Sequence, residues 1–100
     1  MKFFLQATPR RDRIPSAAVI DASLAWIKAR LDDKTFDFCY GFIAGGGVAI
    51  CNADSADAML KLLMNYPGYS FSDFKVEPLC DIATALQEVK AMVQRVAAGA

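Results

Sequence analysis

The stretch NYPGYSFSDFKVEPLC, residues 65–80, contains the point where a helical pattern stops and an extended pattern begins. Pro67 and Gly68 are poor helix formers, and together they predict a helix end followed by a turn. After the turn, charged and apolar side chains alternate with the period of a half-buried β-strand. The charged positions are Asp73, Lys75 and Glu77, and the apolar positions between them are Phe74 and Val76. We therefore predict that residues 69–80 form a strand with its charges on one face.

Hydrophobic periodicity places six further elements around this strand. The predicted order is a strand over residues 2–7, a helix over 16–32, a strand over 36–43, a strand over 48–52, a helix over 55–66, the strand over 69–80 and a helix over 81–97. The apolar stripes expected to be buried are Ile20, Leu24, Ile27 and Leu31 in the first helix, Met59, Leu62, Leu63 and Tyr66 in the second, and Ile82, Leu86, Val89, Val93 and Val96 in the third. Alternation along the second strand puts its aromatic residues on one face, namely Phe36, Phe38, Tyr40 and Phe42.

Residues 45–47 are three consecutive glycines between two predicted strands. A phosphate-binding loop needs a helix directly after it, so the glycines predict a hairpin turn with positive φ instead. Pairing about this turn places Cys39 nearly opposite Cys51. The third cysteine is Cys80, no two cysteines have Cys-x-x-Cys spacing, and the chain has no histidine. These features argue against a structural zinc site and a histidine-ligated haem. A cross-strand disulfide between Cys39 and Cys51 is one alternative, but in a reducing compartment we expect both to be small core residues with unpaired thiols.

The composition indicates a single soluble domain that conceals some apolar surface in an assembly. Of its 100 residues, 55% are hydrophobic, above the roughly 45–50% of an average domain. Eleven basic and eleven acidic residues cancel, which argues against a nucleic acid or a membrane surface as partner. No apolar run approaches the roughly 20 residues of a membrane span, and residues 1–5 are too short for a signal peptide. We expect a cytoplasmic protein.

The first six elements have the βαββαβ order of the ferredoxin-like α+β fold. We predict one domain over residues 1–100, with its core in residues 1–80 and an extra C-terminal helix in residues 81–97. Two helices then cover one face of a four-stranded antiparallel sheet and leave the other face bare. Because apolar residues occur on both faces, we expect a homodimer or higher homo-oligomer whose sheets close into a dimeric α/β barrel. The third helix would cover a sheet edge or embrace the partner.

Four segments form a recognisable series: Ile43–Gly45 before a short strand, Ala53–Met59, Leu62–Pro67 and Phe74–Cys80. In these segments the chain resembles the muconolactone isomerase family. With the opening Met-x-Phe strand, the likeness spans residues 1–82. The resemblance implies dimeric ferredoxin-like barrels that assemble into rings, and isomerisation of an unsaturated lactone without metal or organic cofactor. It also implies a cavity for a small cyclic acid, in a wider group that includes cofactor-free monooxygenases and polyketide cyclases.

The chain departs from that family at two places. The family has a histidine and a lysine in its first strand where this chain has Phe4 and Gln6. The family has histidine and proline after the fourth strand where this chain has Asp81 and Ile82. We therefore expect the fold to be shared and the namesake reaction to differ.

Without histidine, an acid and a base must come from other side chains. Inside a dimer cavity, Asp73 or Glu77 would be desolvated and could remove a proton next to a carbonyl group. Lys75 could steady the resulting enolate, and Tyr40 could donate a hydrogen bond to the carbonyl oxygen. The predicted catalytic residues are Asp73, Glu77, Tyr40 and Lys75. The predicted substrate-binding residues are Phe4, Gln6, Trp26, Phe38, Phe42 and Arg11.

Each assignment has a structural alternative. An alternating charged row is also typical of a solvated strand surface, Trp26 is typical of a helix core, and the basic cluster around Arg11 is typical of a solvated loop. We predict a cofactor-independent isomerase or cyclase acting on a small unsaturated lactone, aromatic or polyketide-like metabolite. The alternatives are a non-catalytic small-molecule-binding or assembly module and a cofactor-free monooxygenase.

Overall fold

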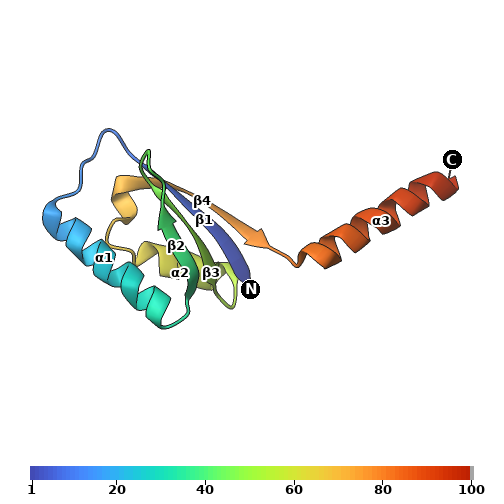
Figure 1. The fold of residues 1–100 in the computed structure, drawn as a ribbon, viewed down its shortest axis with the longest axis horizontal. Helices are drawn as coiled ribbons and strands as arrows, with labels where there is room; N and C mark the ends of the chain where they lie inside the picture. The colour runs from blue at the N-terminus through green and yellow to red at the C-terminus, as the bar shows by residue number, and fades with distance from the viewer. Residues whose placement is uncertain (100) are drawn as a thin grey trace.

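The structure is a computed structural model that describes residues 1–99 (Figure 1). Its elements, in chain order, are β1 (Lys2–Pro9), α1 (Ala17–Asp32), β2 (Phe36–Gly41), β3 (Gly47–Asn52), α2 (Ala56–Met64), a 3₁₀ turn (Tyr69–Phe71), β4 (Ser72–Leu79) and α3 (Ile82–Gly99). The strands form one antiparallel sheet in the order β2-β3-β1-β4. This is the ferredoxin-like βαββαβ arrangement with an added helix, so the predicted fold class is confirmed.

Strand register separates the two faces of the sheet. Phe3 lies opposite Cys51 and Leu5 lies opposite Ala49, and residues directly opposite each other point to the same face. All four are buried. Met59 and Leu63 of α2 join this core, and the C-terminal half of α1 packs against it. Both helices therefore cover the same face, which we call the helix face.

The opposite face, which we call the open face, carries the alternate residues of every strand. They are Lys2, Phe4, Gln6 and Thr8 of β1, Phe38 and Tyr40 of β2, Val48, Ile50 and Asn52 of β3, and Asp73, Lys75, Glu77 and Leu79 of β4. Within the described chain, no helix covers this face.

Side-chain caps begin all three helices. The hydroxyls of Ser16 and Ser55 accept hydrogen bonds from the backbone N–H groups of α1 and α2. The carboxylate of Asp81 accepts one from the N–H of Thr84 in α3, at 3.0 Å. Such caps satisfy donors that a helix cannot satisfy itself, which is why each helix begins at these residues.

A β-bulge in β2 corrects the predicted side-chain alternation. Phe36 lies opposite Cys51, but Phe38 lies opposite Ile50, with the register shift between them. The extra residue turns Phe36 into the core, where it is 3% exposed, while Phe38 stays on the open face. The aromatic residues of β2 therefore do not share one face.

The same register corrects the position of Cys39. Cys39 lies opposite Ala49 rather than Cys51, and all three cysteines are free. The hairpin itself forms as predicted, because Gly45 and Gly46 have φ values of 111° and 82°. Gly46 also leaves no room for a β-carbon beside the carbonyl of Ala7, so this turn requires glycine.

The fourth strand starts later than predicted. Residues 69–71 form a 3₁₀ turn, and β4 begins at Ser72. The carbonyl of Tyr66 accepts a hydrogen bond from the N–H of Tyr69, and Gly68 accepts one from Phe71. The chain thus continues to turn after Pro67 before it extends.

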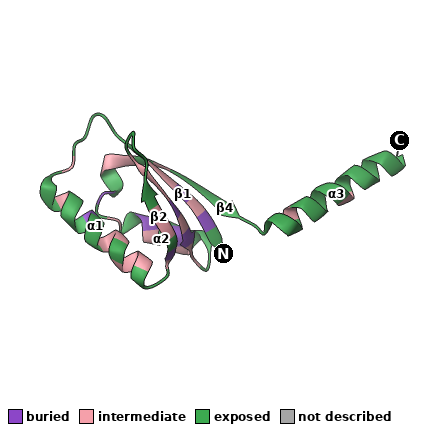
Figure 2. Ribbon diagram, viewed as in Figure 1, coloured by how far each residue is buried: buried purple, intermediate pink, exposed green. Residues whose placement is uncertain are grey.

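Two helices expose apolar residues that were expected to be buried. In α1, Ile20 and Leu24 are 54% and 66% exposed, whereas Ile27 and Leu31 pack against the core. The N-terminal half of α1 therefore stands away from the sheet. The α3 stripe is exposed along its whole length because α3 projects from the end of β4 (Figures 1 and 2). None of the described helices is long and apolar enough to cross a membrane.

Candidate functional site

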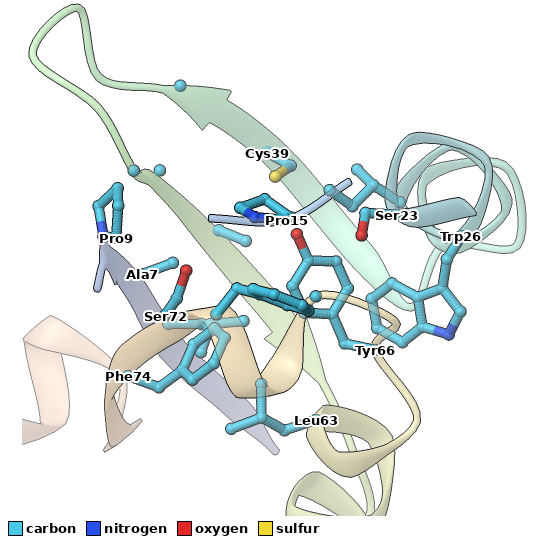
Figure 3. A pocket seen from close by; sticks show the side chains of 18 of the residues that line it. Ala7, Pro9, Pro15, Ser23, Trp26, Cys39, Leu63, Tyr66, Ser72 and Phe74 are labelled. Atoms are coloured by element: carbon cyan, nitrogen blue, oxygen red, sulfur yellow. The ribbon is translucent and has the colours of Figure 1, made fainter. Parts of the chain in front are cut away.

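A cavity of about 620 Å³ lies between α1, α2 and the helix face of the sheet (Figure 3). It exists because the N-terminal half of α1 diverges from the sheet, so that Ile20 and Leu24 line its mouth instead of sealing it. Its volume falls within the roughly 300–1,000 Å³ of small-molecule sites. The fold thus provides a ligand-sized space within a single chain.

Aromatic rings form a continuous wall of this cavity. The ring centroid of Trp26 is 5.6 Å from that of Phe36 and 5.3 Å from that of Tyr66. The Tyr66 ring in turn meets Phe74 edge to face, with centroids 6.2 Å apart. Such a wall suits a flat, unsaturated or aromatic ligand.

Two hydroxyl groups point into the space beneath α1. Ser23 is 8% exposed, and none of the side-chain hydrogen bonds among residues 1–99 involves it. Figure 3 shows the oxygens of Ser23 and Tyr66 directed into this space. A hydroxyl inside a cavity that makes no hydrogen bond to the protein is free to bind a water or a ligand. Ser23 and Tyr66 are therefore candidate donors to an oxygen atom of a ligand.

Two arginines line the rim of the cavity. Arg10 is already occupied, since its Nε and Nη2 atoms donate to Asp12 at 3.1 and 2.9 Å. These hydrogen bonds hold the pKa of Asp12 below its usual value. The guanidinium carbon of Arg13 lies 4.9 Å from the ring centroid of Phe71, and Arg13 forms no ion pair within residues 1–99. Arg13 is thus a positioned cation that can receive a carboxylate or phosphate.

The cavity has a thiol but no carboxylate. Cys39 lines it, and burial raises the pKa of this thiol, which keeps it protonated. Among the described residues, no Asp or Glu side chain lines the cavity, and no cluster of residues could hold a metal ion. A proton acceptor would have to come from the rim. There Asp73 lines an adjoining shallow depression together with Arg10 and Arg13.

The predicted catalytic residues lie on the open face of the sheet, and of these only Asp73, at the start of β4, also borders the depression beside the cavity. Asp73, Lys75 and Glu77 are exposed on the edge strand β4, and Lys75 Nζ lies 3.4 Å from Glu77 Oε1. Tyr40 lies on β2, at the opposite edge, with its ring 5.6 Å from that of Phe38. Three strand spacings of about 4.8 Å separate the two edges by roughly 14 Å. In one chain, Tyr40 and the β4 charges therefore cannot touch one small substrate.

The predicted binding residues are also divided between the two faces. Trp26 lines the helix-side cavity, whereas Phe4, Gln6 and Phe38 lie on the open face. Phe4 lies opposite Glu77, and Gln6 lies opposite Lys75. The two remaining residues belong to neither group: Phe42 follows the end of β2 and is 45% exposed, and Arg11 lies in an exposed loop outside the cavity lining.

Sequence reasoning missed Ser23 and Arg13 as cavity residues and treated Tyr66 only as core. The available signal was a small polar residue beside the apolar stripe of α1, since Ser23 lies one helical turn from Ile20. Arg13 belongs to the basic cluster that was considered as an anion anchor, but the pattern could not say which arginine would face inward.

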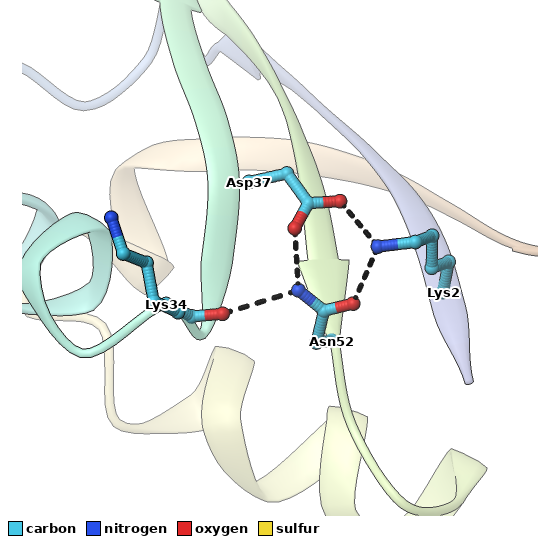
Figure 4. Close-up of polar contacts among 4 residues, drawn as sticks. All are labelled: Lys2, Lys34, Asp37 and Asn52. Carbon is cyan, nitrogen blue, oxygen red and sulfur yellow. Dashed lines mark hydrogen bonds and ion pairs between the residues drawn. The ribbon is translucent and has the colours of Figure 1, made fainter.

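The members of a polar cluster on the open face form hydrogen bonds with one another (Figure 4). Lys2 Nζ lies 2.6 Å from Asp37 and donates to the Asn52 side chain at 2.9 Å. The Asn52 amide donates to Asp37 at 2.7 Å and to the carbonyl of Lys34 at 3.1 Å. These bonds tie β1, β2 and β3 together at one end of the sheet. This cluster is therefore a structural feature rather than a ligand site.

The fold is that of muconolactone isomerase. A crystal structure of muconolactone isomerase matches with a TM-score of 0.69 and 19% sequence identity, covering 81% of this chain and 90% of that one. The 5-chloro-2-hydroxyhydroquinone dehydrochlorinase of Burkholderia phenoliruptrix AC1100, in complex with 2,5-dihydroxybenzoquinone, matches with a TM-score of 0.61 and 17% identity, covering 80% and 94%. No curated protein sequence matches the chain.

One protein family matches almost the whole chain. Its model covers residues 1–93, which include the entire ferredoxin-like core and most of α3. The chain therefore belongs to the family described as "Domain of unknown function (DUF3303)".

Proposed function

We propose that this protein is a cofactor-independent isomerase or cyclase that binds a small unsaturated or aromatic acid in the helix-side cavity. The observation that carries the proposal is the aromatic cavity with the Ser23 hydroxyl, which has no side-chain hydrogen bond, inside it and the Arg13 cation at its rim. Lactones, aromatic acids and polyketide-like compounds all combine a flat apolar body with a carbonyl or carboxylate oxygen. The fold is shared with muconolactone isomerase and with a 5-chloro-2-hydroxyhydroquinone dehydrochlorinase that was solved in complex with 2,5-dihydroxybenzoquinone, which supports a small unsaturated cyclic ligand.

Each group has a role in this proposal. Arg13 binds the carboxylate of the substrate, and the aromatic wall holds its ring. The hydroxyls of Ser23 and Tyr66 donate hydrogen bonds to the oxygen on which negative charge develops when a neighbouring proton is removed. Asp73 is the proposed proton acceptor, because it is the carboxylate that shares a depression with the two rim arginines. Glu77 points to the open face and takes no part in this cavity.

We also propose that the protein works as a homodimer or higher homo-oligomer. The open face exposes aromatic side chains in a single chain, including Tyr40 at 69%. Packing two open faces together would form a dimeric α/β barrel and bring the β4 charges of one copy toward the β2 aromatics of the other. This arrangement would remove the separation between Tyr40 and the β4 charges.

Binding can be measured directly because Trp26 is the only tryptophan of the chain and lines the cavity. We expect small unsaturated cyclic acids to change its fluorescence and their neutral methyl esters to bind more weakly. Loss of a charge-assisted hydrogen bond typically costs about 1.5–3 kcal/mol. Arg13→Gln should therefore weaken acid binding about tenfold or more, while Arg11→Gln serves as a control for net charge. Equal affinity of acid and ester for the wild type would contradict the proposed role of Arg13.

The second candidate function is a non-catalytic binding module. It is favoured by the lack of a carboxylate in the described cavity lining. A measurement of turnover distinguishes it from an enzyme. An isomerase that removes a proton next to a carbonyl exchanges it with solvent. We expect deuterium from D₂O to enter a bound acid in the presence of the protein, as followed by proton NMR. Binding without exchange or product formation across the compounds that bind would support the binding module and reject the enzyme.

A further inference from the structure

The α3 helix has an apolar seam that nothing else in the described chain covers. We define the seam as Ile82, Leu86, Val89, Val93 and Val96, whose exposed fractions range from 50% to 70%. Figure 1 shows α3 extending away from the sheet, and Figure 2 shows it exposed almost throughout. This seam is separate from the cavity and from the open face. Neither ligand binding in the cavity nor packing of the open face therefore explains the seam.

The spacing of the seam is that of a helix that packs against another helix. Successive seam residues are four, three, four and three positions apart, which is the a/d spacing of the 3.5-residue coiled-coil repeat. The flanking positions are mostly small, at Ala83, Ala85 and Ala97. Small flanking residues allow two helices to approach closely on both sides of the seam.

The exposed surface of the chain also requires a large partner. The accessible area is 7206 Å², whereas a compact monomer of this mass exposes about 5,600 Å². The radius of gyration is 17.6 Å, against about 13 Å for a compact chain of this length. The excess of about 1,600 Å² exceeds the roughly 800 Å² that each partner buries in a standard protein interface.

Charge distribution argues against a membrane surface as this partner. Helices that lie on membranes are rich in Lys and Arg on their polar face and carry Trp or Phe on the apolar face. The polar side of α3 has only Lys90 and Arg95 as cations, with Glu88 opposing them, and α3 contains no aromatic residue. With so few charges, two copies of α3 would not repel each other.

We propose that the α3 seam packs against the α3 seam of a second copy of this chain. A self-complementary contact of this kind closes around a twofold axis. This contact accounts for the 3.5-residue spacing of the seam and would bury part of the excess exposed area.

Paired variants of the full chain test this interface by sedimentation. The wild type should sediment as an even multiple of the 10.9 kDa chain. The double variants Leu86→Glu/Val93→Glu and Leu86→Lys/Val93→Lys should each have half that mass or less. The matched control Gln87→Glu/Gln94→Glu adds the same charge to the opposite side of α3 and should keep the wild-type mass. Because α3 projects from the domain, near-ultraviolet circular dichroism of Trp26 should be unchanged in every variant.

A mixing experiment identifies the surface that the seam contacts. If seam faces seam, a 1:1 mixture of the Glu and Lys double variants should regain association that neither variant shows alone. A mixture that remains dissociated would place the seam against another part of the second copy and overturn the proposal. A monomeric wild type, or seam variants that keep the wild-type mass, would overturn it as well.

Discussion

A β-carbon on Gly68 would lie 2.8 Å from Cε2 of Tyr66, closer than two such atoms can approach. The Tyr66 ring packs between Trp26 and Phe74, so moving it away from such a β-carbon would disturb both contacts. Gly68 has a φ of −84°, which any residue adopts, so space and not backbone strain requires glycine here. Gly68, which the sequence pattern predicts to end α2, therefore also leaves the space that the Tyr66 ring occupies in the cavity wall.

We predict that Gly68→Ala lowers the free energy of unfolding by about 1–3 kcal/mol, as overpacking in a core does. Urea unfolding followed by Trp26 fluorescence measures this change, and the emission of the folded state should shift because the neighbouring Tyr66 ring moves. Gly99→Ala is the matched control, since a β-carbon there meets nothing within 4 Å. Equal unfolding midpoints for the two variants would show that the Tyr66 ring is free to yield.

The three cysteines should react in the order Cys80, Cys39, Cys51. Cys80 is exposed, whereas burial raises the pKa of Cys39 and raises that of Cys51 to about 12. Only the thiolate form of a cysteine attacks a disulfide reagent, and the thiolate fraction falls about tenfold for each unit by which the pKa rises. We expect one thiol to react rapidly at pH 8, a second slowly, and the third only on unfolding, as measured by release of the chromophoric thiol.

A ligand in the cavity should protect one cysteine selectively. Cys39 lines the cavity and Cys80 does not. In single-thiol variants, a bound acid should therefore slow modification of Cys39 several-fold and leave the rate of Cys80 unchanged. Equal rates at Cys39 with and without a saturating ligand would mean that the ligand binds elsewhere, such as on the open face.

The fold could be predicted from the sequence because its signals are local. Adjacent residues are enough to identify each of three features. These are the helix end at Pro67-Gly68, the strand at the alternating residues of β4 and the hairpin turn at the three glycines. The bulge in β2 could not be predicted in this way, since Phe36 and Phe38 alternate regularly in the sequence. It depends on pairing with β3, where Asn52 binds Asp37 from a distant part of the chain.

The site was harder to predict than the fold for a related reason. Periodicity shows which side of α1 faces the sheet, but it does not show how far the helix stands from it. The cavity depends on that distance, which places Ile20 at a mouth instead of in a core. The residue types on β4 form a chemically capable row, yet the sheet register directs Lys75 and Glu77 away from the cavity found in one chain.

Asp37 should make stability depend on pH in the acid range. Hydrogen bonds from Lys2 and Asn52 hold the pKa of Asp37 below its usual value. A carboxyl group whose folded pKa is lowered stabilises the fold above its unfolded pKa of about 3.9, and this stabilisation is lost as the pH falls through the folded value. We predict that Asp37→Asn lowers the urea midpoint at pH 7, and that its difference from the wild type shrinks below about pH 4. Asp54→Asn, which removes an exposed carboxylate, is the control; a gap that persists unchanged at pH 2 would contradict this linkage.

Asp73 and Glu77 provide the decisive test of catalysis, because they differ in position but not in chemistry. Both lie on β4, but Asp73 also borders the depression that holds Arg10 and Arg13. General-base catalysis typically contributes about 10²–10⁴-fold to a rate. We predict that Asp73→Asn lowers solvent-deuterium exchange by this factor with little change in binding, whereas Glu77→Gln, on the open face, should leave the exchange rate unchanged. Asp57→Asn, on the exposed first turn of α2, should keep the wild-type rate. Full exchange in both β4 variants would remove the charged row from the mechanism and leave the Tyr66 hydroxyl and the Cys39 thiol as candidate proton-transfer groups of the cavity.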